Sequence, residues 1–280
     1  MRVLVTGATG FTGGHLARAL KARGYDVRAM VRTPSAGQSL AAEGITLVPG
    51  DLARPDSLAH AVKDIDVVYN IAALYRQAGL PESLYRQVNA TAVGQLIEAS
   101  AAAGVTRVVH CSTVGVHGDI EHPPAGEDAP LRPGDVYQES KVEGERIARA
   151  TAEKTRLPVA IARPSGIYGP GDRRLLKLFR GVARRKFVIL GDGEIFYHLT
   201  YIADVVEGLR LCGEIPQAAG QTYILAGAEV PTLNDLVKLI AADANVAPPS
   251  FHLPVWPFWL AGAACGAVCA PFGLEPPPYR

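Results

Sequence analysis

Short apolar runs alternate with amphipathic segments along the first 165 residues of the chain. Runs rich in Val, Leu and Ile predict buried strands at residues 3–6, 26–31, 45–48, 66–69, 107–110 and 158–161. Apolar residues at helical spacing predict helices at residues 11–23, 84–103 and 136–151, and glycines at 24 and 104 end the first two. Strands that alternate with helices predict an α/β fold with a Rossmann-like, doubly wound parallel sheet.

The regular alternation of predicted strands and helices ends after Pro164. Short strands are expected at residues 187–189 and 222–225, and helices at 202–212 and 233–242, which together indicate a small mixed lobe. We therefore predict a Rossmann domain over residues 1–165, to which some later segments return, and a C-terminal lobe over residues 166–280.

Residues 246–274 form an unusually apolar stretch, in which His252 is the only ionisable side chain besides the cysteines. Prolines leave 13 residues between Pro257 and Pro271. A helix of that length spans roughly 20 Å, less than the ~30 Å hydrocarbon core of a bilayer. We expect a buried or substrate-covering helix, with an interfacial membrane contact as the alternative that is not favoured.

The charge and cysteine content restrict which binding partners and which cellular compartment are expected. The 280 residues hold 28 Lys and Arg against 27 Asp and Glu, so no charge excess indicates nucleic acid or an anionic surface. The four cysteines form no Cys-x-x-Cys pair, and the N-terminus shows no signal-peptide pattern. A reducing, cytoplasmic location is expected, and no residues are assigned to a metal.

A glycine-rich turn follows the first predicted strand. Gly7, Gly10 and Gly13 are three residues apart, and the turn leads into a helix. Glycines let the backbone approach a pyrophosphate at a helix N-terminus, where free N–H groups and the helix dipole favour anions. The strand–turn–helix context therefore predicts a dinucleotide site, whose turn also includes Thr9, Phe11 and Thr12.

The residues after the second and third strands bear on which dinucleotide binds. Arg32 lies where an acidic residue would favour NAD, and an arginine there can pair with the 2′-phosphate of NADP. We expect NADP, with NAD as the alternative. Asp51, followed by Leu52, is placed to accept a hydrogen bond from the adenine amine. The alternatives are an exposed arginine and a loop or cap aspartate.

Tyr137 and Lys141 lie at positions i and i+4 of a predicted helix and so share one face. A phenol has a pKa near 10, and a neighbouring ammonium together with a positively charged nicotinamide lowers it. The pair therefore indicates a tyrosine that exchanges a proton and a lysine that supports it.

Taken together, these motifs resemble the extended short-chain dehydrogenase/reductase family, from residue 2 to about residue 280. The resemblance implies that Thr113, with Ser112 beside it, holds the substrate oxygen, and that Lys141 also binds the nicotinamide ribose. It implies that Asn89 positions the active site. It also places Ala72, Ala73, Pro164 and Ser165 beside the cofactor. The family usually has histidine where this chain has Asn70.

Three features bear on the reaction within this family. Val114 and Gly115 follow Thr113, where dehydratases of the family carry an Asp-Glu pair. No Lys or Arg occurs in residues 191–198, where epimerases commonly keep a phosphate-binding arginine, although basic residues at 173, 174 and 177 are an alternative. The apolar C-terminus resembles the 3β-hydroxysteroid dehydrogenase-like branch, whose members usually continue past this point.

The first hypothesis is an NAD(P)-dependent oxidoreductase. It transfers a hydride between nicotinamide and a carbinol or ketone carbon of a hydroxysteroid-like or other apolar substrate in the C-terminal lobe. The alternatives are a sugar-nucleotide epimerase that oxidises its substrate transiently and a non-catalytic NADP-binding regulator. The resemblance also implies a homodimer through the two long helices, with Ala99, Ala102 and Ala148 as close-packing positions.

Overall fold

A computed structural model describes residues 1–77, 79–258 and 260 of the chain. It divides into two compact units. The first comprises Met1–Gly171 and Leu199–Ala228, and the second comprises Asp172–His198 and the described residues from Glu229 onward. The first unit thus extends to Gly171 rather than to the expected residue 165, and a single later segment returns to it.

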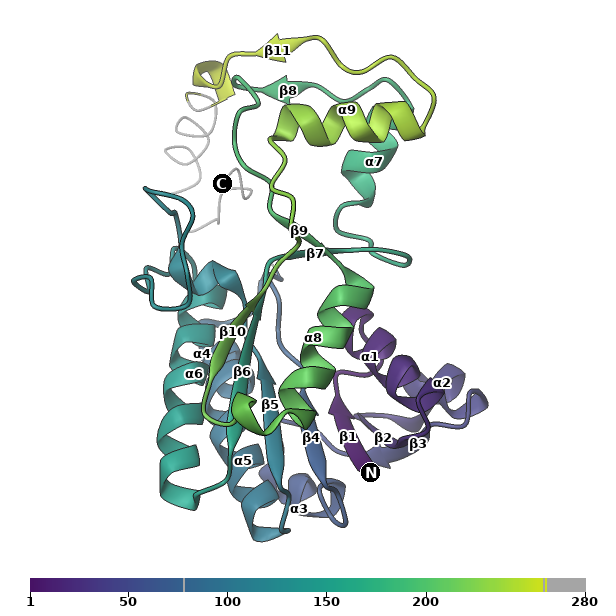
Figure 1. Cartoon of the computed structure of the whole chain (residues 1–280), viewed down its shortest axis with the longest axis vertical. Helices are drawn as coiled ribbons and strands as arrows, with labels where there is room; N and C mark the ends of the chain where they lie inside the picture. The colour runs from purple at the N-terminus through teal and green to yellow at the C-terminus, as the bar shows by residue number, and fades with distance from the viewer. Residues whose placement is uncertain (78, 259, 261–280) are drawn as a thin grey trace. The chain divides into compact units, whose positions relative to one another are not determined.

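Seven parallel strands form the sheet of the first unit (Figure 1). In sheet order they are β10 (Thr222–Leu225), β6 (Val159–Pro164), β5 (Arg107–Cys111), β4 (Val67–Asn70), β1 (Arg2–Thr6), β2 (Asp26–Val31) and β3 (Thr46–Pro49). The chain runs outward from β1 in one direction through β2 and β3, and then returns to β4 on the other side of β1. The predicted doubly wound sheet is confirmed, and its switch point lies between β1 and β4, where such folds bind ligands.

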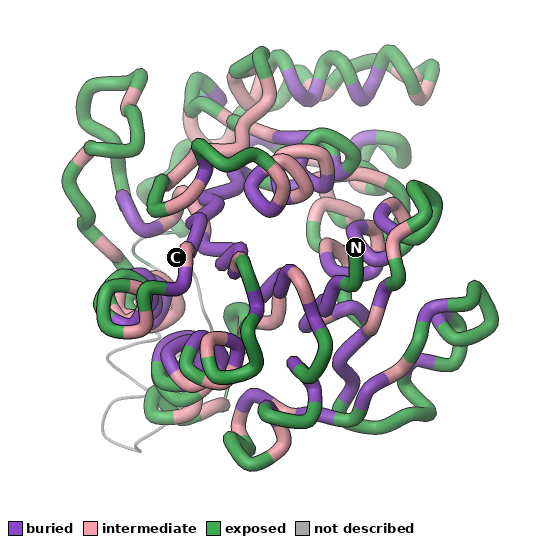
Figure 2. The backbone as a smooth tube through the Cα atoms, turned by 60° about the horizontal axis from the view of Figure 1, so that its bottom comes forward, coloured by how far each residue is buried: buried purple, intermediate pink, exposed green. Residues whose placement is uncertain are grey.

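Helices cover both faces of this sheet because its strands alternate between two apolar clusters. On β1, Val3 and Val5 join a cluster with α1 and α8, whereas Leu4 joins the cluster with α3, α5 and α6. Figure 2 shows the buried residues gathered along these central strands. The helices of the unit are α1 (Phe11–Ala22), α2 (Gln38–Ala42), α3 (Leu58–Ala61), α4 (Glu82–Arg86), α5 (Ala92–Ala102), α6 (Val136–Thr155) and α8 (Ile202–Glu214).

The long helix expected at residues 84–103 is divided into three parts. Helix α4 leads through a π-helical turn, Gln87–Thr91, into α5. The helix expected at 136–151 begins as predicted and continues to Thr155, where Arg156 ends it with a left-handed backbone, φ 58°.

Two elements expected in the C-terminal lobe belong to the first unit. Strand β10 pairs with β6 at the edge of the large sheet, and α8 packs against α1. The residues that each element contacts come from distant parts of the chain, so the local pattern does not show which unit the element joins. A short parallel pair, β7 (Gly166–Tyr168) and β9 (Leu199–Tyr201), also lies in this unit.

In the described part of the second unit, helix α7 (Leu176–Ala183) packs against helix α9 (Leu233–Asp243). This unit also has a parallel pair of short strands, β8 (Ile189–Leu190) and β11 (His252–Leu253), so β8 starts later than the strand expected at 187–189. No described helix is both long enough and apolar enough to cross a bilayer. The helix expected between Pro257 and Pro271 lies almost entirely outside the described residues.

Candidate functional site

The glycine-rich turn is closed by contacts that leave no space for side chains. Gly7 has a left-handed backbone, φ +66°, and a Cβ on it would lie 2.8 Å from the Cα and N of Ala72. A Cβ on Gly13 would lie 2.3 Å from the carbonyl oxygen of Gly7. The Gly10 N–H donates to that same oxygen at 2.9 Å. These positions therefore require glycine.

The turn presents the start of helix α1 to a ligand. Gly10 is the N-cap residue, no side chain caps the helix, and its first turn has no acidic residue. Thr9 and Gly10 are exposed, and Phe11 and Thr12 are half-buried. A helix start with free backbone N–H groups attracts an anion, so the residues of this turn fit the pyrophosphate of a dinucleotide.

A buried hydrogen-bond network joins the turn to the ends of β4 and β5. The Thr6 hydroxyl accepts from the backbone N–H groups of Ile71 and Ala72, both at 3.0 Å, and donates to Asn70 Oδ1 at 2.8 Å. The Asn70 amide then pairs with His110 Nδ1 at 3.2 Å. Half-buried Ala72 is thus fixed beside Gly7, and Ala73 next to it is exposed.

The network determines the protonation of His110. Because Thr6 donates to Asn70 Oδ1, the Asn70 nitrogen must donate to Nδ1, so the His110 proton lies on Nε2. That Nε2 is buried with no hydrogen-bond partner among the described residues. Burial, and then the nearby Lys141 cation, hold the pKa of His110 well below its ordinary value. His110 is therefore a neutral donor on the helical face of the sheet that carries α6.

The residues expected at the adenine end of the cofactor differ in whether their side chains already have hydrogen-bond partners in the protein. Arg32 is exposed and makes no hydrogen bond or ion pair to any described residue, whereas Arg28 donates to the Lys63 carbonyl at 2.8 Å. Asp51 Oδ1 accepts from the Ala53 N–H at 3.0 Å, so one carboxylate oxygen serves its own turn. Leu52 is buried.

Tyr137 and Lys141 lie one helical turn apart at the start of α6. Asp135 caps this helix by accepting from the Gln138 N–H at 2.8 Å. Lys141 is 1% exposed, and its Nζ donates to the Cys111 carbonyl at 2.6 Å. The ammonium therefore lies at the end of β5, next to the segment that carries the expected substrate-binding hydroxyls.

Thr113 and Ser112 occupy this segment after β5. Thr113 is half-buried, and its Oγ1 accepts from the Gly115 N–H at 3.1 Å as the cap of a 3₁₀ turn, Val114–His117. No described residue accepts a hydrogen bond from this hydroxyl, so its proton can be donated to a ligand. Ser112 is buried, and its backbone N–H donates to the Ala162 carbonyl at 2.6 Å.

The pKa of Tyr137 is not lowered in this structure, although a neighbouring Lys141 ammonium was expected to lower it. Burial, and then the nearby Cys111 and Tyr75, raise the pKa of Tyr137 above its ordinary value, and burial lowers the pKa of Lys141. The rings of Tyr75 and Tyr137 meet edge to face at 5.0 Å between centroids. Lys141 is directed at a carbonyl, so the protein residues alone do not lower the pKa of this phenol.

Asn89 lies in the π-helical turn and is fully buried. Its Nδ2 donates to the Leu74 carbonyl at 2.9 Å and to Ser140 Oγ at 3.0 Å, and its Oδ1 accepts from the Leu74 N–H at 2.8 Å. It therefore joins the irregular segment that follows β4 to helix α6. π-Helical turns occur frequently at functional sites.

A buried ion pair that the sequence did not reveal lies one turn beyond Lys141. Arg163 and Glu145 are each 3% exposed, and their side chains share two hydrogen bonds of 2.9 and 2.7 Å. Arg163 also donates to His117 Nε2 at 3.1 Å and to the Glu127 carbonyl at 2.8 Å. This network secures the loop before α6.

The two residues expected beside the nicotinamide follow Arg163 and are buried. Pro164 ends β6, and Ser165 Oγ lies 2.5 Å from Thr200 Oγ1. The Ser165 N–H donates to the Leu225 carbonyl at 3.0 Å, so this residue joins the ends of β6, β9 and β10.

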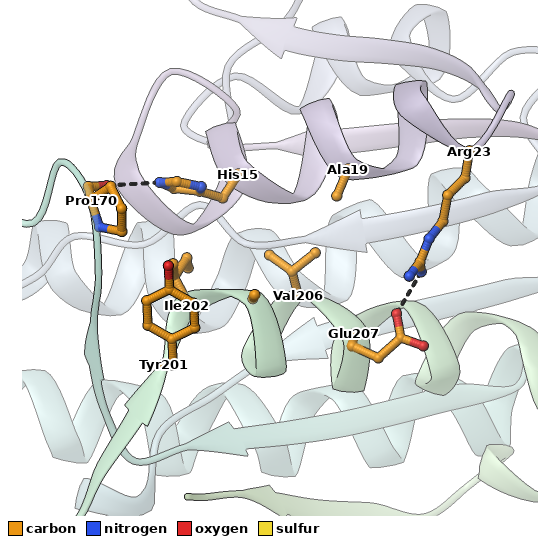
Figure 3. Close-up of a pocket in the computed structure, with 9 residues that line it drawn as sticks. His15, Ala19, Arg23, Pro170, Tyr201, Ile202, Val206 and Glu207 are labelled. Carbon is orange, nitrogen blue, oxygen red and sulfur yellow. Dashed lines mark hydrogen bonds and ion pairs between the residues drawn. The ribbon is translucent and has the colours of Figure 1, made fainter.

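A separate groove of about 310 Å³ runs between α1 and α8 (Figure 3). The His15 ring pairs with the Pro170 carbonyl at 3.0 Å near one end, and an Arg23–Glu207 ion pair of 2.5 Å lies at the other. None of the residues expected to bind the cofactor or to act in catalysis lines this groove. Among the described residues, no group of His, Cys, Asp or Glu is arranged to hold a metal ion.

The model of the NAD dependent epimerase/dehydratase family matches residues 3–226. The chain belongs to this family. Its members that resemble the chain are NAD-dependent dehydrogenases, reductases and epimerases. The expected extended short-chain dehydrogenase/reductase identity and the enzymatic nature of the protein are confirmed at this level.

Two curated relatives and one solved structure illustrate the range of the family. A 2-alkyl-3-oxoalkanoate reductase of Stenotrophomonas maltophilia is 33% identical over 86% of this chain and 75% of its own length. A 3-beta-hydroxysteroid dehydrogenase of Mycolicibacterium neoaurum is 33% identical over 81% of this chain and 66% of its own. The UDP-glucuronic acid 4-epimerase of Bacillus cereus, solved in complex with NAD, has a TM-score of 0.79 at 27% identity, covering 91% of this chain and 87% of that one.

Proposed function

We propose that this protein is an NAD(P)-dependent oxidoreductase that transfers a hydride between the nicotinamide and a carbinol or ketone carbon of an apolar, hydroxysteroid-like substrate. The observation that carries the proposal is the buried Lys141 ammonium on the last carbonyl of β5, one helical turn from Tyr137. This brings an acid–base pair to the carboxyl end of the sheet, the edge at which the glycine turn also lies.

In this proposal the glycine turn and the start of α1 hold the pyrophosphate, and Lys141 turns from the Cys111 carbonyl to the nicotinamide ribose. The cofactor, when bound, supplies the hydride acceptor or donor. Tyr137 gives or takes the proton of the substrate oxygen, and the Thr113 hydroxyl donates a hydrogen bond to that oxygen. Asn89 holds α6 in place behind Tyr137.

We propose NADP as the preferred cofactor, on the basis of Arg32. Its guanidinium is exposed directly after β2 and makes no hydrogen bond or ion pair with a described residue, so it is available to a 2′-phosphate. A hydrogen bond to a charged group contributes about 1.5–3 kcal/mol, so Arg32→Ala should weaken NADPH binding by roughly 10- to 150-fold. Binding of NADH should stay unchanged. Equal weakening of both cofactors would contradict this assignment.

The substrate preference rests on the turn after β8 in the second unit. Asn234 of α9 donates through Nδ2 to the Asp192 carbonyl at 2.8 Å and to Glu194 Oε1 at 2.7 Å, so this helix holds the turn, which carries carboxylates. Carboxylates repel a diphosphate, which favours an apolar substrate over a sugar nucleotide. The family match and the likeness to a UDP-glucuronic acid epimerase keep the epimerase as the second candidate.

A calorimetric titration of UDP and dTDP into the NADP-saturated protein separates these two functions. No heat with either nucleotide, together with turnover of hydroxysteroids or long-chain hydroxyketones at the nicotinamide absorbance, is the expected result. A dissociation constant well below ~1 mM would favour the epimerase. Tyr137→Phe should abolish turnover under both functions while preserving cofactor binding. If turnover survives, the assignment of Tyr137 is wrong.

Three further expectations remain part of the proposal. We propose that the second unit binds the substrate, that the protein is a homodimer and that it works in the cytoplasm, where the buried thiols of Cys111 and Cys212 stay reduced. Ala148 faces the core of its own chain and is fully buried, so its predicted place in a dimer interface is wrong. Ala99 also packs against that core, whereas Ala102 is exposed. Sedimentation velocity will give the oligomeric state.

A further inference from the structure

The second unit exposes an apolar surface on its pair of short strands, β8 and β11 (Figure 1). In β8, Ile189 is buried whereas Leu190 is 49% exposed, because successive side chains point to opposite faces. Val188 lies two residues before Leu190 on the same outward face and is also exposed. Phe251, the residue before β11, is 64% exposed.

The chain beyond β11 adds further exposed apolar side chains. Trp256 is 66% exposed, and Val255, Phe258 and Leu260 are each about half exposed. Single exposed apolar residues are normal on a protein surface, but a run of aromatic and aliphatic side chains on two paired segments indicates an interaction site. We call the exposed side chains of Val188, Leu190, Phe251, Val255, Trp256, Phe258 and Leu260 the β8–β11 surface.

The segment that precedes β8 carries charge of one sign. Between Asp172 and Asp192 the chain carries seven Lys or Arg and no acidic residue, and residues 244–274 carry no Asp, Glu, Lys or Arg. Arg184, Arg185 and Lys186 are all exposed and immediately precede the strand that supplies Val188 and Leu190. The two carboxylates that follow β8 are held by hydrogen bonds, since Asp192 accepts from the Glu194 N–H and Glu194 accepts from Asn234 of α9.

We infer that the β8–β11 surface is a peripheral docking site for an anionic lipid bilayer, with its aromatic and aliphatic side chains in the headgroup region and the three basic residues against lipid phosphates. Trp is favoured at membrane interfaces, Phe and Leu occur on the apolar faces of segments that lie there, and clustered Lys and Arg are attracted to anionic leaflets. A surface against a second copy would bring the two basic clusters close together, which disfavours that occupant. The inference is independent of the proposed reaction.

Cosedimentation of the full chain with vesicles tests this docking. Binding is expected to vesicles of phosphatidylcholine and phosphatidylglycerol at 7:3 and not to phosphatidylcholine alone, and it should weaken at high salt. Replacing Arg184, Arg185 and Lys186 together by Gln should lower the partition coefficient roughly 100-fold, at about fivefold for each basic residue. The matched control replaces three exposed cations of the first unit, Lys21, Lys63 and Arg86, by Gln and should bind as the wild type does.

The apolar part is tested through tryptophan fluorescence. The chain has two tryptophans, so Trp259→Phe leaves Trp256 as the only reporter. Its emission should shift to the blue on adding the anionic vesicles and should be quenched by brominated acyl chains. Tyr137→Phe should bind vesicles unchanged, which separates this inference from the proposed reaction.

Three results would overturn the docking site. They are no binding to anionic vesicles, equal binding of the basic-cluster variant and the wild type, and a blue shift that depends on protein concentration without lipid. The last of these would assign the surface to contact between copies of the chain.

Discussion

Replacing Arg163 by Met is expected to destabilise the fold strongly, because it strands the Glu145 carboxylate in the interior. The two side chains are each 3% exposed, and the pair shares two hydrogen bonds. Removing one partner of a buried ion pair costs about 3–5 kcal/mol. For a chain of this size the melting temperature should fall by on the order of 10 °C.

The Arg163–Glu145 pair allows both a compensating variant and a matched control. Glu145→Gln removes the charge that Arg163 neutralises, so the double variant should be more stable than Arg163→Met alone. Arg149 lies 3.8 Å from the Glu145 carboxylate at a half-exposed position and offers only partial compensation. Arg132→Met, which breaks an exposed ion pair with Glu121, serves as the control and should change little. Urea unfolding followed by circular dichroism measures the free energy of unfolding of the wild type, Arg163→Met, the double variant and Arg132→Met. The reasoning is refuted if Arg163→Met matches the Arg132→Met control.

The same pair makes a prediction about pH. Burial alone would raise the pKa of Glu145, but the hydrogen bonds from Arg163 and the nearby charges of Arg163 and Arg149 hold it below its ordinary value of 4.5. A carboxylate with a lowered folded pKa contributes stability above the unfolded value, and this stability is lost as the pH falls through the folded value. The stability difference between wild type and Glu145→Gln should therefore be constant near neutrality and shrink below about pH 4.5.

Three further predictions concern the glycine turn and the network behind it. Gly13→Ala should abolish cofactor binding, because the added Cβ would lie 2.3 Å from the backbone oxygen of Gly7. Gly14→Ala is the control, because its Cβ would lie 3.1 Å from the Ala8 carbonyl oxygen, and it should retain most of the cofactor binding. Calorimetric titration of the cofactor measures both variants. Thr6→Val leaves two backbone N–H groups without their acceptor, which should cost about 1–3 kcal/mol in urea unfolding, and Thr6→Ser should restore the loss. Wild type should lose stability as the pH falls below 6.5, where unfolded His110 takes a proton that the folded state excludes, and His110→Phe should flatten that slope.

The strand framework could be predicted from sequence because each buried parallel strand is a local apolar run. The positions of β10 and α8 could not. Strand β10 is a short, half-buried edge strand, and only its partner β6 assigns it to the large sheet. Helix α8 is amphipathic wherever it packs, and the contacts with α1 that place it come from residues far away in the chain.

The site divides in the same way. The glycines of the turn lie three residues apart and Tyr137 and Lys141 lie four apart, so local spacing reveals each motif. The Thr6–Asn70–His110 network joins residues 64 and 40 positions apart, and no local pattern indicates it. The sign of the Tyr137 pKa shift also depends on burial and on Cys111 and Tyr75, which only the folded chain brings near it.

That raised pKa favours one direction of the proposed reaction. Reduction of a ketone needs Tyr137 protonated, and burial keeps the proton on the phenol. Oxidation needs the phenolate, so its rate must rise with pH. We therefore expect kcat/KM for reduction to be flat from about pH 6 to 8 and kcat/KM for oxidation to climb over the same range. A fall in the reduction rate through neutral pH would mean that another group, or a much lower Tyr137 pKa in the complex, controls proton transfer. Repeating both profiles with Lys141→Arg distinguishes these cases. The variant keeps the positive charge but carries it in a larger side chain, which changes the contact with the ribose. The pH profile should therefore shift if that contact sets the Tyr137 pKa in the complex, and it should stay unchanged if another group controls proton transfer.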